Sequence, residues 1–581
     1  MQIAESKRTL AAWLAAFTLI VLGAKVWTIQ LWTTNLPYWD QWDEARLLFI
    51  PWLEGHLTWH DLFIHHNEHR IFFTRLLDLL EVKINGQWDI YFQTVVNAFI
   101  HIAYGCGLVA ILWHLAGRKN AGLICFALIP FFALPFSGEN TTLGFQSQFY
   151  FANIFSVLAI LGLGFGRPCG KVWFGGLLAA LCALFTMASG FLAAAAIIGL
   201  ILLRAVRQKS LSRPAICTIL LAATVIAMGL ALKVDIAQHA QLKAKSPGDF
   251  LRTLVDVLAW PFSECPIMVL LVCLPVVVVA IKYFRGKFEN PRVPEFILAL
   301  AGWSLLQAVV LAYGRARIVE SSRYSDALST LPLVNSAALF VLANLSGWSP
   351  RLKKFAPAMI LAWCAVILAG EVQESRVVAK DYLDGVRGGG LAQLETVRAY
   401  LATKDPAVMQ NADALAVPHW SYVPVMEALN HPALVAILPD DAFPPADASR
   451  HSGHFSAAAL WLVDHAVAVL CVGLILSLLL AARALRQPGI SLHNEGLGWV
   501  CILLIAVVVG IGAFSLRDIN RVNYAIALHE RVAVYYTKAG RDADAAVHLR
   551  EVLRLKPDDA EARSELEVVQ SHMTNNPTTL K

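Results

Sequence analysis

Long apolar runs recur along the whole chain and alternate with shorter polar stretches. A membrane-spanning helix needs about twenty predominantly apolar residues, so this pattern predicts an all-α, polytopic membrane protein with about 13 transmembrane helices. A transmembrane barrel would instead show alternating segments of about ten residues, which the sequence lacks. The predicted spans are 10–31, 91–115, 121–137, 149–166, 172–188, 190–204, 214–233, 265–282, 295–313, 326–346, 355–370, 457–482 and 496–515. The pair within 172–204 is either two full crossings or a short hairpin.

The Lys and Arg residues between the spans predict the orientation of the chain. Cytoplasmic loops carry an excess of these residues, and counting from a cytoplasmic N-terminus makes every predicted inside loop basic, as in 204–213 and 282–292. This register places six segments outside: 32–90, 138–148, 234–264, 314–325, 371–456 and the tail from 516. The pattern suits a bacterial inner (plasma) membrane with a periplasmic C-terminal tail, and it would suit an endoplasmic reticulum protein as well.

Composition and motifs narrow the class further. The chain is 57% hydrophobic and 15% charged, whereas soluble domains carry roughly 25% charged residues. No P-loop, GxSxG, HExxH or Rossmann fingerprint has a supporting context, so nucleotide-driven transport is not expected. Few ionisable residues lie inside the spans, which argues against ion-coupled transport. Membrane lipids are expected partners, and nucleic acid is not.

The opening loop, 32–90, carries the most unusual polar chemistry. Asp40, Asp43 and Glu44 lie within five residues among tyrosine and tryptophan, and a second polar group follows at 65–70, containing His66, His69 and Arg70. Such an acidic cluster can accept a proton from a hydroxyl or hold a cation. The alternative is an amphipathic connection on the membrane, with its aromatic residues as interfacial anchors. Apolar stretches at 47–53 and 71–80 predict interfacial helices.

Two short outer segments complete the candidate site. In the turn 138–148, Glu139 and Gln146 would help to form the floor of a polar cavity, unless the turn is simply solvated. The loop 314–325 contains Arg315, Arg317 and Arg323, followed by Tyr324. Arginines on the outer side oppose the usual bias, and guanidinium groups bind phosphate oxygens in pairs. A phosphate-linked lipid is therefore the predicted ligand; headgroup binding or pairing with neighbouring acids is the alternative.

The last third of the chain adds a cap and a tail. Residues 380–400 look helical but interrupted at 388–390 by three glycines, and the proline-rich remainder of 371–456 predicts a small extramembrane subdomain or a cap over the membrane-embedded cavity, with no catalytic motif. The tail, 516–570, matches the spacing of one tetratricopeptide repeat at Tyr536, Gly540, Ala545, Leu549 and Pro557. One repeat cannot bury a solenoid core alone, so residues 523–570 are expected to pack on the cap or on a protein partner. Residues 571–581 look disordered.

Residues 1–350 resemble the multispan glycosyltransferases of the GT-C type that use polyprenyl-phosphate sugars, such as protein O-mannosyltransferases and aminoarabinose transferases. In that family the first outer loop follows the first span and carries an Asp or Asp-Glu pair with interfacial helices. Asp43-Glu44-Ala45-Arg46 is the corresponding element here, and Asp40 precedes it by three residues. The resemblance implies a catalytic transmembrane module at 1–350. Further transmembrane helices with the outer segment 371–456 would occupy 351–515.

The resemblance also implies an activity. A sugar would pass with inversion from a lipid-phosphate donor to a glycan, lipid or protein acceptor on the extracytoplasmic face. Asp43 or Asp40 would act as the base, with Glu44 in the same catalytic group. The substrate-binding residues would be His66, His69, Arg70, Arg315, Arg317, Arg323, Tyr324, Glu139 and Gln146. A divalent cation held by Asp40, Asp43 and Glu139 is a further option that no ligand spacing supports.

Two other functions stay open at the level of sequence. A flippase or polymerase for lipid-linked glycans would share the spans and the arginines, but it would not need the acidic pair directly after the first span. A non-catalytic membrane assembly factor would work through its tail, and Asp43 would then be dispensable.

Overall fold

The computed structural model describes residues 5–118, 120–343, 350–413, 416–443, 453–485, 529, 530, 533, 537 and 542–575. Within these ranges the chain is helical and contains no β-strand, only an isolated bridge between His66 and His69. Nine helices of this part are long and apolar enough to cross a membrane, and α10 and α14 are shorter apolar helices. The predicted all-α membrane class is therefore confirmed.

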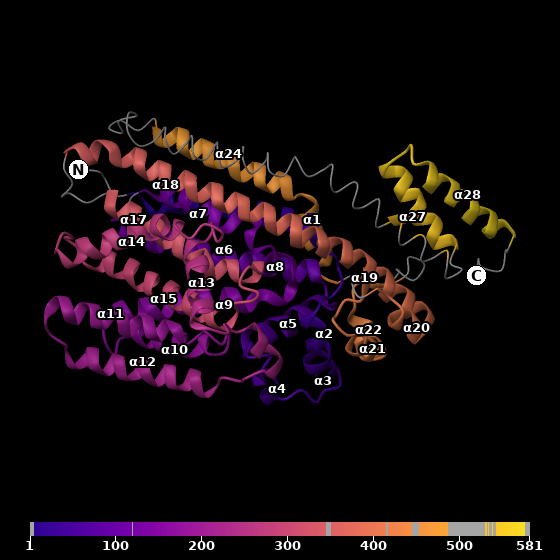
Figure 1. The fold of residues 1–581 in the computed structure, drawn as a ribbon, viewed down its shortest axis with the longest axis horizontal. Coiled ribbons are helices and arrows are strands. Elements are labelled where there is room, and N and C mark those ends of the chain that lie inside the picture. The colour runs from indigo at the N-terminus through magenta and orange to yellow at the C-terminus, as the bar shows by residue number, and fades with distance from the viewer. Residues whose placement is uncertain are drawn as a thin grey trace.

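The long helices form a bundle whose members run roughly side by side (Figure 1). Their bounds are α1 Lys7–Trp32, α6 Ile90–Leu115, α7 Ala121–Ala133, α9 Ser147–Phe165, α10 Lys171–Ala183, α11 Leu192–Gln208, α12 Arg213–Ala231, α14 Met268–Phe284, α15 Arg292–Gly314, α17 Thr330–Ala343, α18 Pro350–Val377 and α24 Ala466–Leu485. Every predicted span that falls on described residues overlaps a helix, and the span 457–482 is divided between two, Ser456–Asp464 and Ala466–Leu485. The span 496–515 lies outside them, so the count of thirteen is not established.

Helix α1 lies in close contact with α24, although the two are distant in sequence. Ser6 caps α1 by accepting a hydrogen bond from the Thr9 backbone N–H. A Cβ at Gly23 would collide with the backbone nitrogen of Leu470. Small residues allow helix backbones to approach this closely inside a membrane. Gly23 therefore brings α24 directly onto the first span.

Short helices form a polar layer at one end of the bundle. The opening loop folds into α2 Asp40–Glu44, the π-helix η1 Ala45–Phe49, α3 Ile50–Leu53, α4 Trp59–Phe63 and α5 Phe72–Asn85, so the predicted helices in this loop are confirmed. The other short elements are η2 Pro135–Ser137, α8 Gly138–Thr142, η3 Gly144–Gln146, η4 Ala237–Leu242, α13 Pro247–Ala259, η5 Ser322–Tyr324 and α16 Ser325–Leu328.

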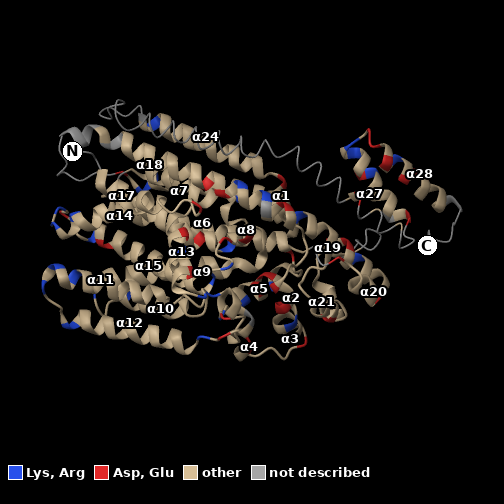
Figure 2. Cartoon of the chain, in the orientation of Figure 1, with Lys and Arg blue, Asp and Glu red and all other residues tan. Residues whose placement is uncertain are grey.

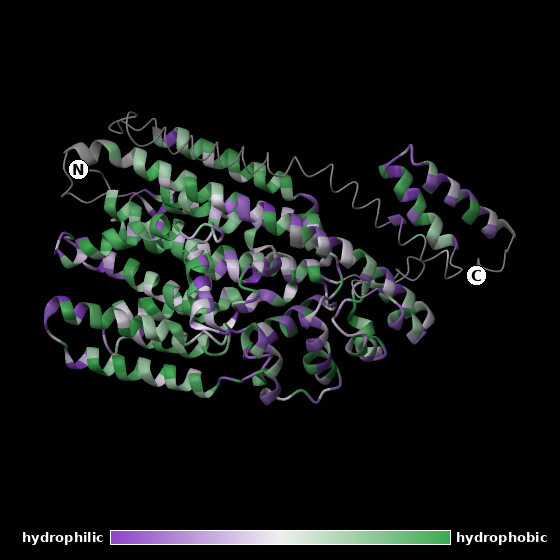
Figure 3. Ribbon diagram, viewed as in Figure 1, coloured by the Kyte–Doolittle hydropathy of each residue, from purple (hydrophilic) through white to green (hydrophobic). Residues whose placement is uncertain are grey.

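Charge and hydropathy separate the two ends of the bundle. Figure 2 shows Lys and Arg at the turns that join α11 to α12 and α14 to α15, at the end away from α2 to α5. Figure 3 shows mostly hydrophobic long helices and a more hydrophilic layer around α2 to α5. The segments predicted to lie on one side of the membrane thus gather at one end of the molecule.

Helix α18 continues through a π-helical turn, η6 Val378–Leu383, into α19 Asp384–Thr403. The interruption predicted at 388–390 does not occur, since the helix runs through all three glycines. A Cβ at Gly390 would lie 2.6 Å from the Thr34 hydroxyl oxygen. At least this glycine is explained by close packing on the opening loop rather than by a break in the helix.

Beyond α19 the chain forms a small helical unit, called the cap below, from α20 Pro406–Gln410, α21 Tyr422–Leu429, α22 Pro432–Ile437 and the 3₁₀ turn η8 Asp440–Ala442. Cap and opening loop share one hydrophobic core, which includes Trp42, Leu48, Phe49, Trp88, Val397, Tyr400, Val425, Leu429, Leu434 and Leu438. The cap is therefore built onto the loop that carries the acidic cluster. Helix α23 Ser456–Asp464 then leads into α24.

The tail contributes a helical pair, α27 Asp542–Leu555 and α28 Ala560–Asn575, with a small core of its own. Both helices fall within or overlap the predicted tail, 516–570, and α28 includes residues 571–575, which were predicted to be disordered and are helical instead. The His548 ring lies 3.9 Å from a Glu395 carboxylate oxygen, so α27 contacts α19. Tyr536 and Gly540 lie outside the described residues, as do 576–581, and the tetratricopeptide-like repeat stays a prediction.

Candidate active site

The acidic cluster begins at a strained residue. Trp39, directly before α2, has φ 49° and ψ −120°, a conformation that non-glycine residues rarely adopt. Its backbone N–H donates to the Pro418 carbonyl of the cap at 2.8 Å. Strain of this kind persists where the surrounding structure fixes it, and it concentrates at functional sites. The cap therefore helps to fix the backbone directly before Asp40, where α2 begins.

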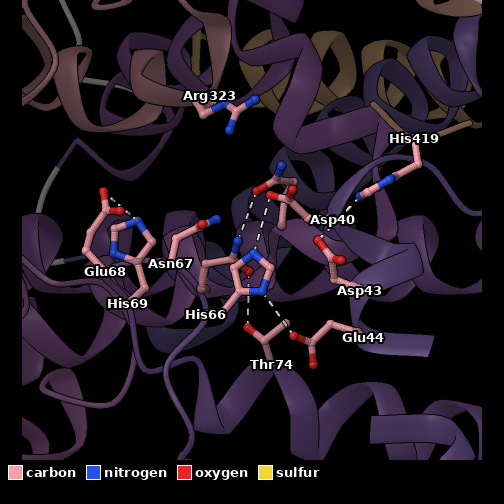
Figure 4. A network of polar contacts seen from close by, with 12 residues as sticks. Asp40, Asp43, Glu44, His66, Asn67, Glu68, His69, Thr74, Arg323 and His419 are labelled. Carbon is pink, nitrogen blue, oxygen red and sulfur yellow. Dashed lines mark hydrogen bonds and ion pairs between the residues drawn. The ribbon is translucent and has the colours of Figure 1, made fainter. Parts of the chain in front are cut away.

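His66 lies between two carboxylates of α2 (Figure 4). Its Nδ1 lies 3.1 Å from Glu44 Oε1, and its Nε2 lies 3.4 Å from Asp40 Oδ2. The ring is buried, at 7% exposure. Burial opposes the charged ring, but the contacts with Asp40 and Glu44 prevail and raise the pKa of His66 to about 9. His66 is thus an imidazolium at neutral pH.

Glu44 is the innermost carboxylate of the cluster. Arg75 on α5 binds it through two hydrogen bonds, Nε to Oε2 at 2.7 Å and Nη2 to Oε1 at 2.8 Å. Burial favours the neutral acid, but the hydrogen bonds from His66 and Arg75 lower the pKa of Glu44 to about 2. Both side chains of the Glu44–Arg75 pair are 1% exposed. Glu44 is therefore ionised and out of reach of solvent.

Asp40 and Asp43 lie nearer the surface, with side chains that are 31% and 26% exposed. For Asp40, burial is outweighed by the contact with His66 and by the charge of Arg323, which lower its pKa. Asp43 contacts His419 of the cap, whose Nε2 lies 3.5 Å from Oδ2. It also lies 4.0 Å from Arg46, one turn along the chain.

The turn at 66–69 separates the acidic cluster from a second polar group. Its backbone closes through two hydrogen bonds, His66 N–H to the His69 carbonyl at 2.8 Å and the reverse at 2.9 Å, and Asn67 takes a positive φ of 50°. His66 faces the carboxylates, whereas Glu68 and His69 line a cavity on the other side. One tight turn thus joins the two halves of the site.

Glu68 forms an ion pair with Arg315 and lies 2.7 Å from His239 Nδ1. His69 Nδ1 accepts a hydrogen bond from the Ala188 backbone N–H at 3.0 Å, which leaves the ring proton on Nε2. Burial lowers the pKa of His69 to about 3, and the charges of His66 and His239 act in the same direction. His69 is therefore a neutral donor beside the cavity.

The cavity has a volume of about 340 Å³ and lies between α9, the end of α12 and α15. Its apolar wall includes Phe149, Met187, Phe191, Leu230, Val310 and Leu311. Its polar lining includes Glu68, His69, Lys233, His239, Lys243, Arg315 and Tyr324. The lining also includes Asp235 and Asp326, and Asp235 pairs with Lys233 and Lys243 as Glu68 does with Arg315, so the polar part carries both signs of charge. An apolar wall beside these cationic groups fits a ligand with a hydrocarbon chain and an anionic head that competes for them.

Arg323 joins the turn 138–148 to the acidic cluster. It forms an ion pair with Glu139, whose other carboxylate oxygen accepts a hydrogen bond from the Ser321 hydroxyl at 3.0 Å. Its Nε has no hydrogen-bond partner among the described residues. Arg323 therefore has one buried N–H without a partner in the described part of the chain, and its charge acts on Asp40.

No protein-family model matches this chain, and no curated protein sequence matches it. Among solved structures it is similar to the crystal structure of ArnT from Cupriavidus metallidurans bound to undecaprenyl phosphate. The identity is 14%, the TM-score is 0.38, and the match covers 74% of this chain and 77% of that one. A likeness at this level does not establish a shared activity.

The remaining predicted residues divide into two groups. Tyr324 belongs to the site, since its hydroxyl accepts a hydrogen bond from Arg315 Nε at 2.9 Å. Arg70 instead donates to the backbone carbonyls of Phe63 and Leu232. Arg317 is half-exposed and pairs with Asp249 at 3.2 Å. Gln146 is buried and accepts a hydrogen bond from Gln148.

The sequence reading missed His419, Lys233, Lys243 and His239. His239 and Lys243 lie in the segment 234–264, which the topology placed outside, and Lys233 ends the predicted span before it, so these basic residues were the available signal. His419 follows Pro418 in the cap, and no local motif marks it.

A bridging metal does not fit the three acids proposed for it. Asp40 is engaged by His66, Asp43 lies beside His419, and Glu139 pairs with Arg323. In the part of the chain that the structure describes, no group of three or more His, Cys, Asp or Glu residues is arranged to hold a metal ion.

Proposed function

We propose that this protein is a membrane glycosyltransferase that moves a sugar from a polyprenyl-phosphate-linked donor to an acceptor on the extracytoplasmic face. The observation that carries the proposal is the adjacency of two half-sites across one turn. The cavity beside Glu68 and His69 combines an apolar wall with three cationic side chains that pair with acids of its lining, and the acidic cluster of α2 lies on the other side of His66. The first suits a lipid phosphate, and the second suits a hydroxyl that must lose a proton.

The donor lipid would lie with its first prenyl units against the apolar wall of the cavity. Its phosphate would lie at the polar end, where Lys233, Lys243 and Arg315 line the cavity. Arg323 would extend this cationic surface toward Asp40, because one of its donors is unpartnered. Arginine binds phosphate through two parallel hydrogen bonds. Arg317, which pairs with Asp249, has no part in this site.

Asp43 is the proposed base. Asp40 shares the His66 imidazolium with Glu44, and its lowered pKa weakens it as a proton acceptor. Glu44 is buried in its pair with Arg75. Asp43 is partly exposed, and its contacts with His419 and Arg46 are longer than the hydrogen bonds of Glu44. Asp40 and Glu44 would then position the loop and supply negative charge.

In the proposed reaction the acceptor oxygen attacks the anomeric carbon as its proton passes to Asp43. The bond between that carbon and the phosphate oxygen breaks, and the electron pair leaves with the lipid phosphate. Because the leaving phosphate is already anionic, stabilisation by cations matters more than protonation by an acid. Arg315, Arg323 and the cavity lysines would provide it. No step requires a metal ion.

Binding of the bare lipid tests the donor half of this proposal. Purified protein in detergent would be titrated with a polyprenyl phosphate and followed by native mass spectrometry. Arg315→Ala and Arg323→Ala should each weaken binding about tenfold or more, since a hydrogen bond to a charged group contributes about 1.5–3 kcal/mol. Arg317→Ala is the matched control from the same loop and should bind like wild type. Equal affinity in all four proteins would contradict the assignment of the donor site.

The sidedness, the domain limits and a role for residues 523–570 in binding a protein partner belong to the same proposal. The clustering of basic turns at the end opposite the site supports an extracytoplasmic site. The contact of His548 with Glu395 supports a tail that docks near the cap.

A further inference from the structure

The cap contributes a buried histidine to the acidic cluster. His419 is 2% exposed, although it lies in a short connection between helices on the outside of the bundle. Its Nδ1 lies 2.9 Å from the Ser421 carbonyl and 3.2 Å from the Ser421 backbone nitrogen. These contacts fix the plane of the ring. They leave Nε2 facing Asp43 at 3.5 Å (Figure 4).

The Nε2 atom of His419 has no hydrogen-bond partner within bonding geometry among the described residues. A buried ring nitrogen without a partner is costly, and the nearby carboxylate of Asp43 is the acidic group that approaches it. Catalytic contacts are often longer in the free enzyme and tighten when substrate binds. The position of the ring therefore suits a group that orients Asp43 during turnover.

Other contacts hold the cap in register with α2. The Trp39 N–H donates to the Pro418 carbonyl, one residue before His419. Arg46 binds Glu427 on α21 at 3.4 Å, and the two segments share a hydrophobic core. His419 is thus held against Asp43 by contacts on both sides rather than by its own side chain alone.

We infer that His419 is a positioning residue for Asp43, so that the active site is completed by a cap more than 370 residues further along the chain. This inference rests on the proposed function. His419 would hold the Asp43 carboxylate toward the acceptor hydroxyl and stabilise its charge through Nε2. The proton from the acceptor would still pass to Asp43.

The experiment compares His419→Ala, His419→Gln and His431→Ala in the full-length protein. His431 is the matched control, because this cap histidine also contacts a carboxylate of the opening loop, Glu54, at 2.9 Å. His419→Ala should lower kcat about 10- to 100-fold and leave the KM for the lipid-linked donor within about twofold, as expected for an orienting contact. His419→Gln, which can donate to Asp43 from a similar position, should recover part of kcat.

A double-mutant cycle separates positioning from general loss of structure. If His419 acts through Asp43, adding His419→Ala to Asp43→Asn should lower the residual rate no further, whereas the same change in Asp40→Asn should lower it by the full factor. Additive losses in both backgrounds would overturn the inference, as would wild-type kcat in His419→Ala.

The free energy of unfolding of the same variants in detergent can be measured whether or not the protein has enzymatic activity. The two substitutions are coupled if their effects on the free energy of unfolding are not additive. Such coupling, together with sugar transfer by wild type but not by Asp43→Asn, would support both proposals. The same coupling without turnover by any form would overturn the proposed function and the catalytic role of His419, while leaving the pair itself established. No coupling and an unchanged kcat would overturn the inference alone.

Discussion

His66 links the protonation of the opening loop to its folding. Its pKa of about 9 lies above the ordinary value of 6.5, so the charged ring stabilises the folded state below about pH 6.5, and this contribution is lost as pH rises through 9. His66→Gln should therefore lower the free energy of unfolding at pH 6 by on the order of 2–3 kcal/mol. The difference from wild type should shrink toward pH 9.5. Denaturant unfolding in detergent at both pH values measures it; a deficit independent of pH would contradict the charged ring.

Ionisation of Asp78 and Glu81 on α5 has the opposite effect on stability: their charged forms destabilise the folded state. Both residues are 3% exposed, and a hydrogen bond from Gln93 only partly offsets the burial of the Glu81 carboxyl. Burial raises the pKa of both acids, and the charge of Glu44 raises that of Asp78 further. Ionisation therefore costs stability as pH rises from about 4 through the raised pKa values.

Glu81→Gln removes that cost while conserving shape. We expect its melting temperature to exceed that of wild type at pH 8 and to approach it at pH 4, where the carboxyl of the wild-type residue is neutral. Thermal unfolding followed by tryptophan fluorescence measures the difference. A variant less stable than wild type at pH 8 would show that the Glu81 charge has a partner and stabilises the fold.

At the scale of single residues, the sequence predicted the carboxylates of α2 and the polar group at 65–70 as neighbours of one site. It did not distinguish their environments. Glu44 is buried because α5 folds back and places Arg75 beside it, a contact across thirty-one residues that no local pattern records. His419 was missed because its role depends on how the cap packs on α2.

Two glycines of α19 allow the packing of this helix on the opening loop to be tested. Gly390 approaches Thr34 closely, whereas a Cβ at Gly385 of the same helix would meet nothing within 4 Å. Gly390→Ala should destabilise the protein by about 1–3 kcal/mol through overpacking. Gly385→Ala is the matched control and should stabilise it by up to about 1 kcal/mol, because alanine has the higher helix propensity. Equal effects at both positions would contradict the close docking of α19 on the opening loop.

At the scale of elements, the apolar runs predicted the positions of the helices well, because burial in lipid requires long apolar segments. The triple glycine was misread as a break because glycine lowers helix propensity, whereas in this fold the tight contact at Gly390 with Thr34 favours it. In the tail, the end of α28 was predicted to be disordered because residues 571–575 contain no apolar run.

For the whole molecule, the proposed function requires the site and the basic turns to lie on opposite sides of the membrane. In a variant without native cysteines, His60→Cys in α4 should react with an impermeant maleimide in intact cells, because the His60 side chain is 85% exposed. Ser210→Cys, in the exposed turn after α11, should react only after the membrane is opened. The reverse pattern would invert the proposed topology.

The most direct test of the central claim is sugar transfer from extracted lipid-linked donors by purified wild-type protein and by Asp43→Asn. Loss of a general base typically costs 10²- to 10⁴-fold in rate. We predict turnover by wild type and a loss of at least about 100-fold in Asp43→Asn, with unchanged binding of polyprenyl phosphate and unchanged melting temperature. Transfer by Asp43→Asn at the wild-type rate would contradict the assignment of the base. Lipid binding without transfer by any form would contradict the transferase itself.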